Sequence, residues 1–360
     1  MKEDTRKSKL KFKFDLWATN SEENGWNISS TDEGSQKMLE EESEKQIKIQ
    51  TGTDVIDDFI LEEDTTDDER MIVNMGPQHP STHGVLRLQA ELEGEVVRRV
   101  KPVIGYLHTG MEKTGEELNY FQGPTNTTRM DYLSPLFNEL VFSLTTEKLI
   151  GIDVPDRAKT IRILMTELNR VSSHLVALAT GGMDIGALSM MIFGFREREL
   201  ILNFFEKTTG LRMNHNYIRP GGVAADLPDG WQSDVEEILK IIPEKLKDYD
   251  DMLLDNPIWR GRLENIGILT TEECFAYGVT GPSLRASGHS WDLRKSQPYS
   301  GIENYDFDVP VLDEGDVFAR WRIKVLEIFE SLKIVEQALN QMPKGPYNCL
   351  LYTSDAADDQ

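Results

Sequence analysis

Apolar residues recur every three or four positions along most of the chain beyond residue 130. This spacing places them on one face of an α-helix, and five segments are long enough to form amphipathic helices. We expect these helices over residues 136–150, 156–180, 185–209, 234–254 and 317–342. The segment 281–311 is rich in Gly, Pro and Ser and is expected to be irregular.

A different pattern surrounds residue 80. Residues 71–75 and 85–92 read as strands, and the second alternates apolar and polar positions. Between them, the ten residues from Met75 to Gly84 hold two His, two Pro and two Gly. Because proline fixes φ and glycine permits positive φ, we expect a rigid turn that carries His79 and His83 at the tip of a hairpin.

Two interpretations of these histidines compete with a functional one. Their i, i+4 spacing resembles a zinc pair, but that spacing brings imidazoles together only on a helix, which Pro80 and Gly84 disfavour. Alternatively the turn is structural and its histidines bond only to the backbone. From residue types alone, the structural turn is favoured, and a metal site is not expected.

The segment 175–195 contains a single charge, Asp184, within 21 residues. Its length suits a membrane span, but Gly181-Gly182 and a central acid argue against one. We expect two buried helices joined by a glycine turn. Asp184 either caps the helix that begins near Ile185 or pairs with a histidine, and sequence spacing does not choose between these.

Charge and composition narrow the function. The chain has 360 residues and a formal net charge of −23, which argues against nucleic acid as a partner. We expect residues 1–50 to form a disordered acidic extension and 51–70 an acidic linker. The two cysteines allow no Cys-x-x-Cys metal site within the chain, and no glycine-rich nucleotide-binding motif is present.

A polar segment precedes the helix predicted at 136–150. It runs Thr128-Arg-Met-Asp-Tyr-Leu-Ser134, so a guanidinium, a carboxylate and a phenol lie within four residues. For an isolated motif, capping of the helix by Asp131 or Ser134, with Tyr132 in the core, is the favoured interpretation. A site for chemistry is the alternative.

Seven motifs in order make the block 71–346 similar to the hydrogenase-like D-type component of bacterial respiratory complex I, called the 49-kDa subunit in mitochondria. They are NMGPQHPSTHGVLR (74–87), GYLHTGMEK (105–113), RMDYLS (129–134), MDIGA (183–187), YIRPGGV (217–223), GPSLR (281–285) and WDLRKSQPY (291–299). The resemblance implies an α+β, mostly α fold: a hydrogenase-large-subunit-like helical core with an N-terminal β-hairpin.

The resemblance also implies a quinone site. His83, Tyr132 and Asp184 match the family's catalytic residues, and His83, Tyr132 and Thr180 match its quinone-binding residues. In that assignment His83 and Tyr132 bond the two quinone carbonyls, Asp184 pairs with His83, and His79 remains a structural turn residue. Departure of the His83 proton would leave Asp184 as an unpaired anion and so could trigger charge movement.

The implied function is that of a quinone-reducing subunit in a proton-translocating NADH:quinone oxidoreductase, active only in the assembled complex. Electrons would come from a 4Fe-4S cluster held by the B subunit, with Arg129 and His215 beside it. Further implied partners are the C subunit and the membrane-embedded H subunit, with NAD and FMN in other subunits. The quinone would be menaquinone or ubiquinone, no cofactor would be bound covalently, and the location would be the cytoplasmic side of the cell membrane.

Two alternatives are a non-catalytic scaffold and a nickel–iron hydrogenase large subunit. Hydrogenases of this fold bind their metals through Cys-x-x-Cys pairs, and the first pair aligns with Asp131 and Ser134, whose oxygens replace thiolates poorly. Other departures are Thr109, where mitochondrial relatives have an arginine, and Asn214, where many relatives have a histidine.

The C-terminus departs most from the resemblance. The chain follows the family to about Pro346, and relatives continue with a further helical and loop segment. We therefore expect that the family domain is truncated and that residues 347–360 form a non-native tail.

Overall fold

The structure is a computed structural model that describes residues 70–79 and 82–349. The expected disordered extension and linker up to residue 69, and the tail from residue 350 onward, lie outside the described residues. The chain divides into two compact units. In its described part, one unit comprises 70–75 and 88–102, and the other comprises the rest.

The first unit is a three-stranded antiparallel hairpin sheet. Strands β1 (Arg70–Met75), β2 (Arg87–Glu93) and β3 (Val96–Val103) follow the order β1-β2-β3, and β1 pairs with β2 from Met75↔Leu88 to Arg70↔Glu93. The two predicted strands are confirmed. The third strand was not predicted, because most of β3 is exposed and its sequence VVRRVKPV lacks the alternation of a half-buried strand.

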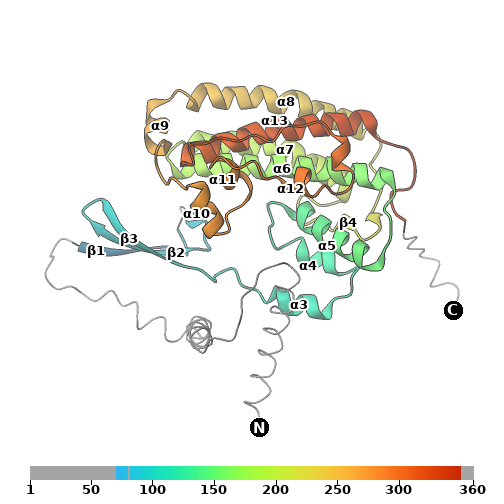
Figure 1. Cartoon of the computed structure of the whole chain (residues 1–360), viewed down its shortest axis with the longest axis horizontal. Helices are drawn as coiled ribbons and strands as arrows, with labels where there is room; N and C mark the ends of the chain where they lie inside the picture. Colours follow the sequence, from blue (N-terminus) through green and yellow to red (C-terminus); the bar gives the residue numbers. More distant parts are fainter. Residues whose placement is uncertain (1–69, 80–81, 350–360) are drawn as a thin grey trace, which may run out of the picture. The chain divides into compact units, whose positions relative to one another are not determined.

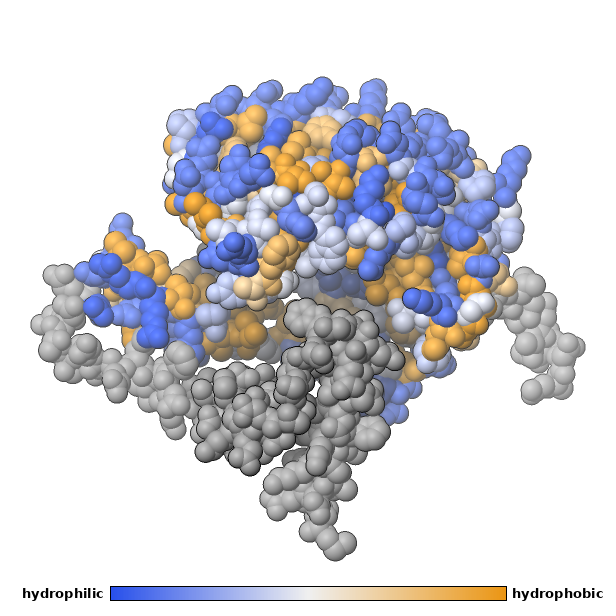
Figure 2. Space-filling model, viewed as in Figure 1, coloured by the Kyte–Doolittle hydropathy of each residue, from blue (hydrophilic) through white to orange (hydrophobic). Residues whose placement is uncertain are grey.

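The second unit is built on long helices, and all five predicted helices are present. They are α5 (Pro135–Ile150), α6 (Asp156–Asp184), α7 (Leu188–Thr209), α8 (Trp231–Leu253) and α13 (Val317–Gln341). Four of them lie side by side, with α6 packed between α7 and α13, and α8 in contact with both of these (Figure 1). The outer face of α8 is largely hydrophilic (Figure 2), as expected for an amphipathic helix at the edge of a bundle.

Shorter elements join and cover this bundle. They are α3 (Met111–Glu117), α4 (Gly123–Thr127), β4 (Ile218–Arg219), β5 (Gly222–Val223), α9 (Pro257–Leu263), α10 (Thr271–Ala276), α11 (Gly281–Arg285), α12 (Leu293–Ser296) and the 3-10 turn η2 (Ile302–Asn304). The segment expected to be irregular thus contains short helical turns. The predicted α+β, mostly helical class is confirmed.

The boundary between α6 and α7 differs from the prediction. The expected glycine turn at Gly181-Gly182 is wrong, because α6 runs through both glycines to Asp184 and the chain turns at 185–187. A Cβ on Gly182 would lie 2.6 Å from the Cβ of Met190, so this glycine serves close helix packing instead of a turn. Within the described residues, no helix is long and apolar enough to cross a membrane.

The last described residues extend the small sheet of β4 and β5. The amide of Val223 donates to the carbonyl of Tyr347 at 3.0 Å, and the amide of Cys349 donates to the carbonyl of Gly221 at 2.9 Å. Asn348 forms an isolated bridge with Gly222. Residues 347–349 are therefore hydrogen-bonded to β5 and to Gly221 just before it.

Candidate functional site

The histidine turn meets the end of α6. The Nε2 atom of His83 lies 3.2 Å from the Oδ2 atom of Asp184, although 101 residues separate them in sequence. The side chains of His83 and Asp184 are 48% and 33% exposed. The contact is a bond between partly solvated groups.

Buried Thr82 shapes this turn. Its Oγ1 donates to the carbonyls of Pro77 at 3.2 Å and His79 at 3.1 Å, and its amide donates to the same His79 carbonyl. The carbonyl of Thr82 in turn accepts from the amide of Val85. These bonds tie the described residues on either side of the turn together, and His79 contributes its backbone carbonyl to them.

Asp184 does not cap α7. The N-cap of α7 is Ala187, and Asp184 is the last residue of α6. The C-terminal end of a helix carries partial negative charge, so a carboxylate there is stabilised by a cationic or hydrogen-bonding partner. Of the two interpretations that the sequence left open, the structure shows the contact with a histidine.

The segment around Tyr132 forms the turn between α4 and α5. The carboxylate of Asp131 accepts from the amide of Leu133 at 3.1 Å, so it stabilises the turn and does not cap α5. Ser134 occupies the N-cap position, but its hydroxyl lies 3.4 Å from that of Ser173 and makes no capping bond. Tyr132 is 44% exposed, so its expected place in the core is wrong.

Helix α6 relates the two turns. Ser173 contacts the Tyr132 turn, and Asp184 contacts the His83 turn eleven residues later. At 1.5 Å per residue, these two positions are roughly 16 Å apart along the axis. Thr180 lies one turn before Asp184 on the same face, and its hydroxyl donates to the carbonyl of Val176. The structure thus joins His83 to Asp184, whereas the turn that contains Tyr132 meets α6 through Ser134 at the other end of this stretch.

A cavity of about 790 Å³ opens beside the Tyr132 turn. Asp131, Ser134 and Ser173 line it at that turn. Elsewhere its wall is rich in charged and polar groups, namely Arg170, His174, Arg285, Asp292, Arg294 and Tyr299. A cavity whose wall combines these charged and polar groups with apolar side chains such as Phe137, Leu140 and Leu144 thus adjoins the candidate site.

Glu327 on α13 anchors one half of a buried charge network behind this wall. It accepts from His174 Nε2 at 2.8 Å and from Arg285 Nη2 at 2.6 Å. Burial alone would raise the pKa of Glu327, but His174 and Arg285 hold it at about 2. Burial lowers the pKa of His174, which favours the neutral imidazole.

Glu167 on α6 anchors the other half. Its carboxylate accepts from Arg170 and Arg294, each at 3.1 Å, and from the Ser331 hydroxyl at 2.8 Å. Arg294 also binds Asp292 at 2.7 Å. Sequence reasoning did not identify this network. Two of its arginines, Arg285 and Arg294, stand in the GPSLR and WDLRKSQPY motifs, but Arg285 pairs with Glu327 across 42 residues and Arg294 with Glu167 across 127 residues.

Arg129 and His215 lie in different environments. Arg129 is exposed, and its guanidinium donates to the carbonyl of Thr125. His215 is only 4% exposed, with its ring packed edge-on against Phe205 at 5.0 Å between centroids. Neither ring nitrogen has a hydrogen-bond partner, and burial lowers the pKa to about 4, so this imidazole is neutral at physiological pH.

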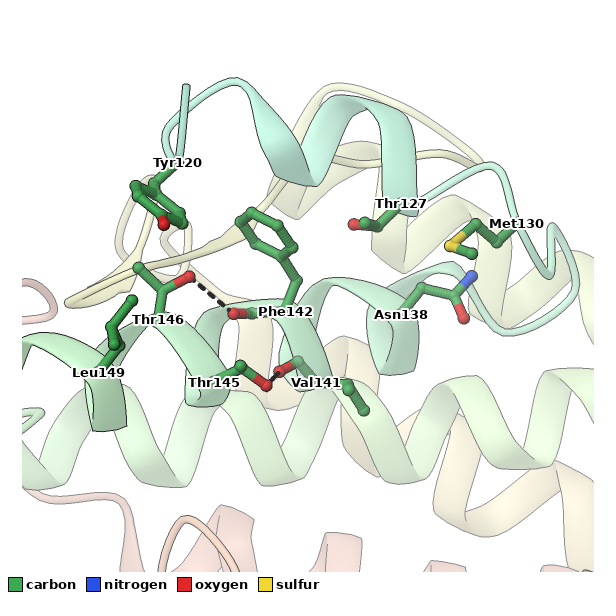
Figure 3. Close-up of a pocket in the computed structure, with 9 residues that line it drawn as sticks. All are labelled: Tyr120, Thr127, Met130, Asn138, Val141, Phe142, Thr145, Thr146 and Leu149. Carbon is green, nitrogen blue, oxygen red and sulfur yellow. Dashed lines mark hydrogen bonds between the residues drawn. The ribbon is translucent and has the colours of Figure 1, made fainter. Parts of the chain in front are cut away.

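A second hollow, of about 360 Å³, lies between α5 and the segment 120–130 (Figure 3). The side chains of Met130, Val141, Phe142 and Leu149 make it largely apolar, and Tyr120 closes one end. Such a surface can accommodate an apolar group. Among the described residues, no cluster of three or more His, Cys, Asp or Glu side chains is arranged to hold a metal ion.

Comparison with known proteins gives a consistent result. A model of the family described as "Respiratory-chain NADH dehydrogenase, 49 Kd subunit" matches residues 184–356. The chain is 57% identical over 285 residues to the D 1 subunit of the NADH-quinone oxidoreductase of Salinispora arenicola, covering 79% of this chain and 65% of the relative. It is 52% identical over 306 residues to the corresponding D subunit of Mycobacteroides abscessus, covering 84% and 71%. The chain thus spans about two thirds of the length of these relatives.

The Glu327 network predicts a specific dependence of stability on pH. Because the pKa of Glu327 is depressed to about 2, its stabilising effect is complete above the usual value of 4.5 and is lost as pH falls toward 2. Glu327→Gln should lower the free energy of unfolding by about 3–5 kcal/mol at pH 7, since it breaks a buried ion pair.

Denaturant unfolding between pH 7 and pH 3 tests this, with the exposed α13 residue changed in Glu336→Gln as the control. The difference in the free energy of unfolding between wild type and Glu327→Gln should decrease below pH 4.5. A difference in the free energy of unfolding that stays constant from pH 7 to pH 3 would contradict the lowered pKa of Glu327.

Proposed function

Because the chain belongs to the family of the 49-kDa subunit of respiratory-chain NADH dehydrogenase, we propose that it is the quinone-reducing subunit of a proton-translocating NADH:quinone oxidoreductase. The observation that carries the proposal is the contact between His83 and Asp184. It gives an imidazole a fixed position and a charged partner at the edge of a helical bundle.

The reaction requires two electrons and two protons for each quinone. Tyr132 can donate a hydrogen bond from its phenol to one quinone carbonyl, and His83 can donate to the other. Because Nε2 of His83 already faces Asp184, the nitrogen that meets the quinone is Nδ1. Both residues lie on turns that carry hydrogen bonds of their own, and a site for oriented proton donation needs donors held in place.

Asp184 has a second role in this proposal. While His83 is an imidazolium, the pair is close to electrically neutral. When the proton passes to the reduced quinone, Asp184 is left as an anion at the negative end of α6, a less favourable place for it. In this proposal, the unpaired negative charge on Asp184 is the electrostatic signal that starts charge movement toward the membrane part of the complex.

The electrons would be supplied by a 4Fe-4S cluster in the B subunit. Arg129 fits a position beside such a cluster, because it is exposed at the end of α4. The ring of His215 is buried within this chain, so it would support the adjoining loop from beneath. Thr180, on the same face of α6 as Asp184, would line the space for the quinone between the two turns.

The remaining assignments follow from this role. The partners would be the B, C and membrane-embedded H subunits, with NAD and FMN bound elsewhere in the complex. The chain would lie peripherally on the cytoplasmic side of the cell membrane, with menaquinone or ubiquinone as substrate. A pure scaffold would not need the His83–Asp184 pair. A nickel–iron site would need thiolates where Asp131 and Ser134 bond within the protein.

The first test concerns quinone binding. Tyr132→Phe removes one donor and keeps the ring, so a quinone analogue should bind the assembled complex about fivefold more weakly, as for the loss of about 1 kcal/mol. Tyr120→Phe, at another exposed tyrosine, serves as the control and should leave the dissociation constant unchanged. Equal affinity in wild type and Tyr132→Phe would support a scaffold role.

The second test concerns coupling. Asp184→Asn keeps the size of the side chain but removes the charge that would be exposed when His83 releases its proton. Protons pumped per electron should fall more steeply than the rate of quinone reduction, measured together in vesicles. Asp156→Asn, at the exposed start of the same helix, is the control. Normal pumping at normal turnover in Asp184→Asn would refute the trigger role.

A further inference from the structure

Helix α5 carries a fully buried carboxylate with neutral partners. Glu139 is 0% exposed, and its oxygens accept from the Thr128 hydroxyl at 2.6 Å. They also accept from the backbone amides of Asn216 at 2.6 Å, Tyr217 at 2.8 Å and Ile218 at 2.9 Å. Burial of a carboxylate without a cation is costly, so four converging donors indicate a built site.

These donors come from two separate segments of the chain. Thr128 directly precedes Arg129 at the end of α4. The three amides directly follow Asn214 and His215, and they lie 77 to 79 residues beyond Glu139 in the sequence. One carboxylate therefore links the two segments that the proposed function places beside the iron–sulfur cluster.

The second segment needs such an anchor. Asn214 and Asn216 both have positive φ, 55° and 48°, a conformation that asparagine tolerates better than most residues. The side-chain oxygens of both asparagines and both ring nitrogens of His215 are buried without hydrogen-bond partners. The loop's own side chains thus make few polar bonds to hold it, whereas three successive amides converge on Glu139.

We propose that Glu139 is a positioning residue that fixes the Arg129 turn and the Asn214–His215 loop as one unit, presented to the partner's iron–sulfur cluster. This inference rests on the proposed function for the identity of the surface. The contacts themselves are independent of it. Burial raises the pKa of Glu139 to about 7, although its four hydrogen bonds act to lower it.

Helix α5 offers a matched control eight residues further on. Glu147 is also buried, but it pairs with the guanidinium of Arg162 at 2.5 Å and accepts from the amide of Gly221 at 2.8 Å. It holds the later part of the same loop without touching Thr128 or the three amides bound by Glu139. Glu147→Gln should therefore perturb the bundle without releasing the proposed unit.

The experiment compares Glu139→Gln with Glu147→Gln in the assembled complex. A glutamine side chain replaces one accepting oxygen with an NH₂ group, which cannot accept from these donors, so Glu139→Gln should speed hydrogen exchange at residues 216–218 by about tenfold. It should also shift the midpoint potential and the electron paramagnetic resonance signal of the partner's cluster. Glu147→Gln should leave that cluster unchanged.

Two outcomes would overturn the proposal: an unchanged cluster in Glu139→Gln despite faster exchange, or equal cluster shifts in both variants. If Glu139→Gln does not assemble, hydrogen exchange is measured in the isolated chain instead. An unchanged exchange rate at residues 216–218 would then overturn the proposed role of Glu139. Failure of the proposed function would appear separately, as normal quinone-analogue binding in Tyr132→Phe.

Discussion

The close packing of α6 between α7 and α13 is the constraint on which the candidate site depends. The approach to α7 is tight: a Cβ on Gly194 would lie only 2.7 Å from the Cβ of Ala179. Helices that pack this closely have no free space in which to shift. The face of α6 that carries Thr180 and Asp184 is thereby fixed. The distance between the His83 turn and the Tyr132 turn is then set by the positions on α6 that they contact.

Buried charge is the second feature that shapes the molecule. Glu139, Glu147, Glu167 and Glu327 are all carboxylates in helix interiors, and each takes donors from segments distant in sequence. Such paired buried charges add little to the stability of the protein compared with an apolar core, but removing one partner strongly destabilises it. They therefore act as fixed points that specify which loop meets which helix. The walls of the large cavity and the loop at 214–218 are both organised in this way.

The sequence predicted the framework better than the details. Helical periodicity located all five long helices, because their apolar faces are wide and continuous. It misplaced the end of α6, since Gly182 reads as a turn residue but is present because Met190 packs against it. It missed β3, whose exposed residues lack alternation. The direct contact between His83 and Asp184 could not come from spacing alone, and only the family resemblance connected them before the structure did.

The buried carboxylates show why the remaining contacts could not be predicted from the sequence. Glu139 and Glu327 appear in the sequence as ordinary acidic positions of amphipathic helices. They differ from such positions in having hydrogen-bond partners that are distant in the sequence. The loop amides that bind Glu139 lie 77 to 79 residues away from it, and His174, which binds Glu327, lies 153 residues away. Local pattern carries no signal for such pairings. The exposure of Tyr132 was hidden for the same reason, because it depends on how the turn docks.

The central claim is that the turns carrying His83 and Tyr132 together form the quinone head-group site. Photolabelling of the assembled complex with a photoreactive quinone analogue, followed by mass spectrometry of the labelled peptides, tests it most directly. We expect labels within residues 76–86 and 129–134 that excess quinone displaces. Displaceable labelling confined to the apolar hollow on α5, or to other subunits, would contradict it.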